Sequence, residues 1–282
     1  MARLLNIHAH PDDEASKGAP TVAKGVAGGH TAYLVCATGG EQGDILNAAM
    51  DRPEIRENLP EVRAKELEAS MKAIGYHHLD WLGFEDSGMA DSEANKNPNC
   101  FAQADFDDAV SRFALLLRRH RPHVVVTYSD VETYRHPDHL MVHDISGPAL
   151  ELAADPNWES ELGGPWQVQK LYYSIRSRAM LVAWQNTYDR LGIESPFGPD
   201  WFDRPSYDDR ITTKVDISGF YHVRRAALLA HATQVDPEEK FWFGIPDDAA
   251  EAAYHHDDYI LAHSTVDTDL PETDLFAGVK DD

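Results

Sequence analysis

The stretch LLNIHAHPDDE, residues 4–14, joins a short apolar segment to a histidine and three acids. Residues 4–8 predict a buried strand, because the segment is short and apolar and Pro11 bounds it. In open α/β sheets, ligands bind beyond the carboxyl ends of the strands. The polar residues 10–14 are therefore expected to lie at a binding site.

Strands and helices are predicted to alternate through the first 175 residues. Further strands are expected at residues 31–38, 78–82, 123–128 and 170–174, and helices at 14–28, 61–75, 106–121 and 139–154. Such alternation implies parallel crossovers. We predict an α/β fold with a Rossmann-like, mostly parallel sheet and helices on both faces.

The pattern weakens after residue 175. We predict a metal-binding catalytic core over 1–175 and a C-terminal extension over 176–282 that packs on it. Residues 247–282 hold eleven Asp and Glu against one Lys. This acidic segment is either a solvated tail or a docked segment that closes over a site, since LPETDLFAG (270–278) carries apolar residues.

Charge excludes several classes of partner. The chain has 282 residues with 25 Lys and Arg against 48 Asp and Glu, a formal net charge of −23. Nucleic acid and anionic membranes need clustered basic residues, so neither is expected as a partner. No apolar run approaches the ~20 residues of a membrane helix. Two distant cysteines, Cys36 and Cys100, give no disulfide framework and favour a cytoplasmic location.

Two histidine clusters predict a metal site. His10 and Asp13 lie three residues apart across a strand-to-helix turn, so both side chains can reach one cation, with the Asp12 carboxylate left free beside it. The sequence HPDH at 136–139 follows the strand at 123–128 and opens on the same side of the sheet. His10, Asp13 and His139 then give three ligands and an open position, as in catalytic zinc sites, although Fe²⁺ suits the same ligands.

The alternative to a metal is ordinary structural use of these residues. An aspartate that caps a helix and a glutamate in its first turn are common without any ion, and loop histidines are often only hydrogen-bonded. Two His-Pro-Asp clusters at two strand ends favour the metal.

The two clusters also resemble a known family. AHPDDE (9–14) and HPDH (136–139) are similar to motifs of the LmbE-like, or PIG-L, superfamily of zinc-dependent N-deacetylases. Other stretches resemble the branch that hydrolyses mycothiol S-conjugates, namely SKG (16–18), TGGEQGDILN (38–47), WLGFEDSGM (81–89), KLYY (170–173), HATQVDP (231–237) and ETDLFAG (272–278). This resemblance spans nearly the whole chain.

The resemblance implies catalytic roles for four residues beside the metal ligands. Asp12 would be the general base. A protonated His136 would offset the charge of the oxyanion or protonate the leaving amine. Asp138 would orient a histidine of its own cluster, and Tyr134 would reach over the reacting carbonyl.

Four further residues are expected to bind substrate. The resemblance implies that Lys17 contacts the cysteinyl part of a conjugate, and that Glu41, Arg63 and Asp86 contact the sugar or inositol. Each has a structural alternative: a surface lysine, a residue of a glycine-permitted turn, a solvated helix arginine and a loop cap, respectively.

Taken together, the resemblance implies a zinc-dependent hydrolase of a linear amide bond. Its substrate would be a small thiol–sugar conjugate, cleaved to an N-acetylcysteine S-conjugate and glucosaminyl inositol in thiol-dependent detoxification. One alternative is a deacetylase of N-acetylglucosaminyl inositol or another small-molecule N-deacetylase of the LmbE-like family, and another is a metal-stabilised sugar-binding protein without turnover. A nucleotide enzyme is disfavoured because no GxGxxG follows residues 4–8. The sequence leaves the oligomeric state open.

Overall fold

The computed structural model describes residues 1–131, 134–158 and 163–280. Within them, seven strands form one sheet in the order β3-β2-β1-β4-β5-β7-β6. The strands are β1 (Arg3–His8), β2 (Thr31–Thr38), β3 (His78–Phe84), β4 (Val124–Tyr128), β5 (Lys170–Ile175), β6 (Thr213–Asp216) and β7 (His256–Ser264). The first five are parallel, which confirms the predicted α/β class.

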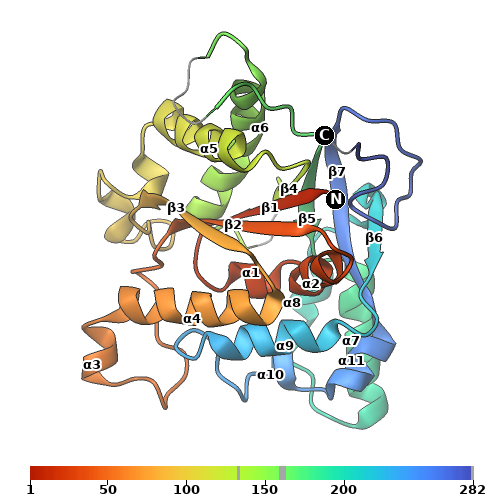
Figure 1. Ribbon diagram of the computed structural model, residues 1–282. Helices are drawn as coiled ribbons and strands as arrows, with labels where there is room; N and C mark the ends of the chain where they lie inside the picture. Colours follow the sequence, from red (N-terminus) through yellow and green to blue (C-terminus); the bar gives the residue numbers. More distant parts are fainter. Residues whose placement is uncertain (132–133, 159–162, 281–282) are drawn as a thin grey trace.

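Helices cover both faces of this sheet (Figure 1). They are α1 (Asp13–Ser16), α2 (Ala19–Ala27), α3 (Pro53–Arg56), α4 (Leu59–Ile74), α5 (Phe106–His120), α6 (Pro137–Ala154), α7 (Arg178–Leu191), α8 (Pro199–Asp203), α9 (Tyr221–Ala230), α10 (Lys240–Phe243) and α11 (Asp247–Ala253). Single 3₁₀ turns occur at Ala94–Lys96, Phe101–Gln103 and Asp208–Arg210.

The single helix predicted over 14–28 is wrong. Helices α1 and α2 are separate because Gly18 adopts φ 96° between them. A Cβ at this position would lie 2.5 Å from the hydroxyl oxygen of Tyr259, so β7 approaches the backbone closely here. Only glycine meets both demands at low cost.

Alternate residues of β1 face two separate cores. Leu4 packs into a core that α2, α4 and α9 cover, and Leu5 and Ile7 pack into a second core under α5 and α6. Figure 1 shows α4 and α9 side by side on one side of the sheet and α5 and α6 on the other. A strand buried on both faces is expected to be mostly apolar, and in β1 only the buried Asn6 and His8 interrupt the apolar run after Arg3.

The C-terminal extension completes the same sheet. Strand β7 pairs with both β5 and β6, in the antiparallel sense, and therefore lies between them. It comes from the acidic segment, as do the buried residues Glu272 and Leu275, which are 3% and 1% exposed. This part of the chain is docked and not solvated, so the solvated-tail prediction is wrong for it. Glu272 and Ala277 bond to Lys170 at the start of β5, away from the carboxyl ends of the parallel strands, so the predicted closure over a site is not observed for these residues.

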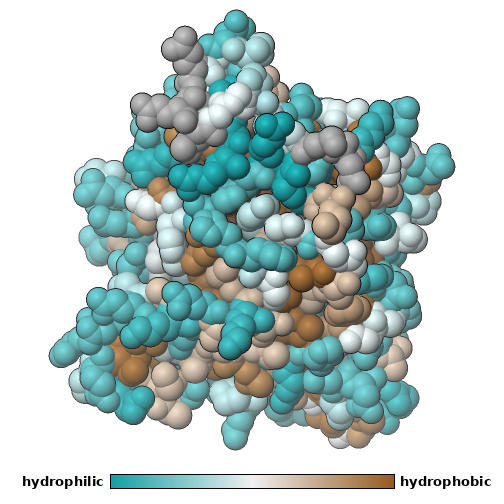
Figure 2. All heavy atoms as spheres, in the orientation of Figure 1, coloured by the Kyte–Doolittle hydropathy of each residue, from teal (hydrophilic) through white to brown (hydrophobic). Residues whose placement is uncertain are grey.

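Hydrophilic residues dominate the face seen in Figure 2, with apolar residues visible between the elements. Among the described residues, no helix has the length and apolar character needed to span a membrane.

Candidate metal centre

Three predicted metal ligands meet at the carboxyl end of the sheet. His10 and Asp13 come from the loop after β1 and the start of α1, and His139 from the first turn of α6 after β4. Asp13 Oδ2 lies 3.5 Å from His10 Nδ1 and 3.3 Å from His139 Nε2. Ligands about 2.0–2.1 Å from a tetrahedral ion would be separated by about 3.4 Å, so these spacings suit one ion. The three residues form a buried group that could hold a metal.

The His10 nitrogen that faces away from Asp13 lies between two carboxylates. Its Nε2 lies 3.2 Å from Asp138 Oδ2 and 3.5 Å from Asp86 Oδ1. A carboxylate can only accept here, so Nε2 carries the proton and Nδ1 faces Asp13. Burial would lower the pKa of His10, but bonds to Asp13, Asp138 and Asp86 raise it well above its usual value. A metal would therefore have to displace a proton from Nδ1.

The Asp138 carboxylate lies within hydrogen-bonding distance of His10, which belongs to the other cluster. Its Oδ2 is 4.0 Å from His136 Nδ1, and it accepts instead from His10 and from the Ser87 amide at 3.0 Å. The carboxylate was predicted to orient a histidine of its own cluster, and its partner is instead His10; only the Asp138 amide bonds to His136. Carboxylates behind a metal-binding imidazole commonly fix its tautomer and ring orientation, and Asp138 is placed to do so for His10.

The Asp13 carboxylate is held in its charged form. Burial alone would raise its pKa, but the charges of His139 and Lys17 and the bond to His10 hold the pKa well below its usual range. Tyr128 donates to Oδ2 at 2.7 Å and Lys17 Nζ to Oδ1 at 2.8 Å. A charged carboxylate with two imidazoles is a donor set suited to Zn²⁺ or Fe²⁺.

Asp12 lies beside this group with an unusual backbone. Its φ is 122°, a value that non-glycine residues rarely adopt. Arg63 Nη2 is 3.3 Å from Asp12 Oδ2, and the Asp12 side chain is still 32% exposed. Desolvation raises the pKa of Asp12, against the charge of Arg63. The carboxylate is thus available to a substrate and its pKa lies closer to neutrality, as a general base requires.

His136 and Tyr134 lie around the same cavity. Burial, followed by the nearby His10, lowers the pKa of His136 to about 4. Its Nδ1 accepts from the Asp138 amide at 3.2 Å, so the ring is neutral with its proton on Nε2. The prediction of a protonated His136 is therefore not supported. Tyr134, 54% exposed, has its ring centroid 5.5 Å from that of His139.

The four residues predicted to contact substrate do not all line the same cavity. Arg63 and Asp86 line the metal cavity, whose volume is about 200 Å³. Lys17 lines an adjacent cavity of about 180 Å³. Glu41 does not line the metal cavity, because its Oε2 accepts from the Asp86 amide at 3.0 Å and so supports that loop.

A larger apolar groove, of about 580 Å³, adjoins the metal cavity and was not predicted. The groove and the cavity share Tyr134 and Gln234, and the groove is lined by aromatic side chains that include Trp201 and Trp242. The Arg176 guanidinium carbon lies 5.3 Å from the centroid of the Trp242 ring. The only signal in the sequence was aromatic residues in stretches without regular periodicity.

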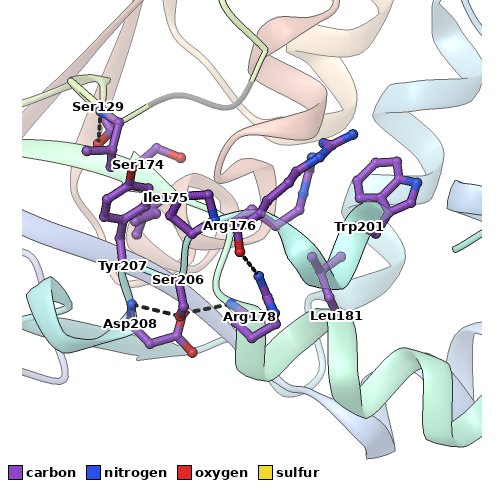
Figure 3. A pocket seen from close by; sticks show the side chains of 13 residues that line it. Ser129, Ser174, Ile175, Arg176, Arg178, Leu181, Trp201, Ser206, Tyr207 and Asp208 are labelled. Atoms are coloured by element: carbon purple, nitrogen blue, oxygen red, sulfur yellow. Dashed lines mark hydrogen bonds between the residues drawn. The ribbon is translucent and has the colours of Figure 1, made fainter. Parts of the chain in front are cut away.

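A small pocket of about 60 Å³ shares Arg176 and Trp201 with this groove. Figure 3 shows these two residues on one side of the pocket and Ser129, Ser174 and Tyr207 on the other. The pocket lies between the end of β5 and the segment after α8. Arg176 lines this pocket, the groove and the cavity of Lys17, so these three cavities meet at its side chain.

Residues 5–150 match the family model described as PIG-L, GlcNAc-PI de-N-acetylase. The chain belongs to the PIG-L family. This confirms the resemblance inferred from AHPDDE and HPDH. Its relatives include an amidase and a deacetylase, so this PIG-L protein is a hydrolase of amide bonds.

Relatives of this PIG-L hydrolase carry two different names. A mycothiol S-conjugate amidase from Streptomyces coelicolor is 42% identical over 99% of this chain and 98% of the relative. A 1D-myo-inositol 2-acetamido-2-deoxy-alpha-D-glucopyranoside deacetylase from Geodermatophilus obscurus is 37% identical over 98% of each. The fold is shared with N,N'-diacetylchitobiose deacetylase from Pyrococcus horikoshii, with a TM-score of 0.63 and 17% identity over 92% of this chain and 83% of that one.

Proposed function

We propose that this PIG-L hydrolase is a zinc-dependent cytoplasmic amidase of mycothiol S-conjugates, acting in thiol-dependent detoxification. It would cleave the amide between an S-substituted N-acetylcysteine and glucosaminyl inositol. The groove of about 580 Å³ beside the metal cavity carries this proposal, because an acetyl group has no use for such a volume. The 42% identity to the amidase from Streptomyces coelicolor supports the same choice.

The two cavities suit the two halves of such a substrate. The metal cavity is polar and includes Arg63 and Asp86, whose charged groups suit the hydroxyls of a sugar and an inositol. The aromatic groove suits an apolar S-substituent, and Tyr134 lies where the two cavities meet. Lys17 faces the cavity between Tyr134 and Arg176, where the cysteinyl part would pass. Glu41 acts on substrate only through the loop of Asp86 in this proposal.

His10, Asp13 and His139 would hold the metal. When bound, a divalent ion supplies a Lewis acid that lowers the pKa of water and polarises the amide carbonyl. Zinc is proposed because two imidazoles and a carboxylate with an open position are typical of its catalytic sites, and Fe²⁺ remains an alternative. Metal analysis of protein isolated without oxygen would distinguish the two.

The chain supplies the proton transfers. Asp12 accepts a proton from the water whose oxygen adds to the amide carbon. Neutral His136 donates a hydrogen bond from Nε2 to the oxyanion. The Tyr134 hydroxyl, at the rim of the cavity, donates a second hydrogen bond to the same oxygen. The carbon–nitrogen bond then breaks, and Asp12 returns its proton to the leaving amine. The products are the carboxylic acid of the cysteine conjugate and the free amine of glucosaminyl inositol.

Deacetylation of N-acetylglucosaminyl inositol is the second candidate. The same catalytic groups perform it, and the relative from Geodermatophilus obscurus carries that name. Measurement of kcat/KM for an aromatic S-conjugate and for N-acetylglucosaminyl inositol would decide between the two. We expect the conjugate to be preferred. Hydrolysis of the acetylated sugar alone would overturn the amidase proposal.

A variant in the groove sharpens this test. Trp242→Ala should raise KM for the aromatic S-conjugate and leave the KM for N-acetylglucosaminyl inositol unchanged, because only the conjugate reaches the groove. Trp81→Ala is the matched control, since Trp81 is 39% exposed on β3 and lines no described cavity of the site. An equal effect of Trp242→Ala on both substrates would contradict the assignment of the groove.

A further inference from the structure

The peptide bond between Pro11 and Asp12 is held at both of its polar atoms. The Pro11 carbonyl oxygen accepts from Arg63 Nη2 at 2.5 Å, and the Asp12 amide donates to Glu14 Oε2 at 2.9 Å. A non-glycine residue with φ of 122° persists only where its surroundings fix it. The guanidinium and the carboxylate together provide that restraint.

Glu14 is in turn held by a residue from far along the chain. Its Oε1 accepts from His231 Nε2 at 2.6 Å and also from the Ser70 hydroxyl. Glu14 is 1% exposed, and His231 and Ser70 are fully buried. The His231 imidazole and the Glu14 carboxylate therefore form a buried hydrogen-bonded pair.

His231 begins a short segment after α9 that a second carboxylate also anchors. The amide of Thr233 donates to Glu66 Oε1 at 2.8 Å and its hydroxyl to Oε2 at 2.6 Å. Glu14 and Glu66 therefore both fix residues 231–233. Of the two, only Glu14 also bonds to Asp12.

We propose that His231 is a positioning residue for the reaction, which holds Glu14 so that Glu14 fixes the backbone, and with it the carboxylate direction, of Asp12. This inference rests on the proposed role of Asp12 as general base. It assigns a role in catalysis to a residue of the C-terminal extension, which lies outside both His-Pro-Asp clusters. Loss of the pair would let the strained Asp12 backbone relax and turn its carboxylate away from the attacking water. A misplacement of about 1 Å can cost about 10²-fold in rate.

The test is a double-mutant cycle on the full-length, metal-loaded protein. His231→Leu removes the donor to Glu14, and we expect kcat to fall about 10²-fold with KM changed less than about threefold. His231→Gln keeps an amide donor and should recover much of kcat. Combined with Asp12→Ala, His231→Leu should cost nothing further, because its effect passes through Asp12. Either substrate named above serves as the probe, whichever the protein hydrolyses.

Glu66→Gln is the matched control, because it weakens the other carboxylate anchor of the same segment. It should lower thermal stability to a similar extent and change kcat less than about threefold. Equal losses of kcat in His231→Leu and Glu66→Gln would overturn the inference, as would an undiminished effect of His231→Leu in the Asp12→Ala background. Loss of bound metal in His231→Leu would overturn it too, since the effect would then act through Asp13.

Two outcomes separate this inference from the proposed function. An Asp12→Ala variant that retains full activity refutes the role of Asp12 itself. Loss of activity in Asp12→Ala with normal activity in His231→Leu refutes only the positioning role. Should His231→Leu fail to fold, Glu14→Gln enters the same cycle, with the same expected dependence on Asp12.

Discussion

Lys170 and Glu272, 102 residues apart in sequence, form an ion pair whose side chains are both fully buried. The same carboxylate accepts from the Tyr172 hydroxyl at 2.5 Å and from the Thr213 hydroxyl at 3.0 Å. Glu272 thus joins β5 and the start of β6 to the C-terminal segment. The stretches KLYY and ETDLFAG, which the sequence analysis noted separately, bind each other through this pair.

Removal of the carboxylate should destabilise the fold strongly. Glu272→Gln leaves the Lys170 ammonium buried without its counterion, and breaking such a pair costs about 3–5 kcal/mol. Denaturant unfolding should show this as a lower free energy of unfolding. Glu194→Gln, which breaks the exposed pair between Glu194 and Lys240, should leave the stability unchanged. A loss in Glu272→Gln no larger than in Glu194→Gln would contradict the assigned role.

The pair also predicts a pH dependence. Burial would raise the pKa of Glu272, but the bonds to Lys170 and to the hydroxyls of Thr268 and Tyr172 lower it. A carboxyl whose folded pKa is depressed contributes stability that is present above its unfolded pKa, about 4.3, and lost as the pH falls through the folded pKa. The stability difference between wild type and Glu272→Gln should therefore shrink below about pH 4.3. A difference that stays constant down to pH 2 would refute this linkage.

Asp12→Ala should separate turnover from metal binding. Asp12 is outside the group formed by His10, Asp13 and His139, so bound metal per chain should stay unchanged. Loss of the general base should lower kcat by about 10²–10⁴-fold. Elemental analysis and single-substrate kinetics measure the two quantities. A folded variant without metal would make Asp12 a ligand and refute its assignment as base.

Asp138→Asn should weaken metal binding without removing a ligand. An amide placed beside His10 Nε2 no longer offers a charged acceptor, and loss of such a partner typically costs 10–100-fold in metal affinity. Competition with a chelator measures this change. His263→Ala, on the exposed end of β7, is a control that should leave the affinity as it is. Unchanged affinity in Asp138→Asn would show that His10 needs no such support.

The elements that show a local periodicity in the sequence were predicted correctly. The prediction failed where an element depends on partners far away in the sequence. The parallel strands through β5 follow from apolar runs and the helices between them. Strand β7 was missed because HDDYILAHS begins with acids. Asp257 is tolerated there because it accepts from the Thr21 hydroxyl at 2.8 Å and pairs with Arg224. These partners come from α2 and α9, so composition around residue 257 gives no sign of them.

In the candidate site, too, the sequence predicted the residues within the motifs but not their contacts with residues remote in sequence. The sequence brought His10, Asp13 and His139 together because the carboxyl ends of neighbouring parallel strands meet at one edge. It did not reveal that Asp138 reaches across to His10, or that Glu14 is paired with His231 over 217 residues. The lowered pKa of His136 depends on burial and on the nearby His10, and its tautomer on a backbone amide; none of these is evident from the motif.

The position of β7 between β5 and β6 has a consequence for how the protein is made. Within the described residues, β6 pairs with β7 and, at Thr213, with Glu272, so it has no neighbour in the sheet until residue 256 and its successors have been synthesised. Until then β5 presents an open edge, to which a strand of another chain can add. During translation, the growing polypeptide is therefore exposed to misassembly until β7 has been synthesised.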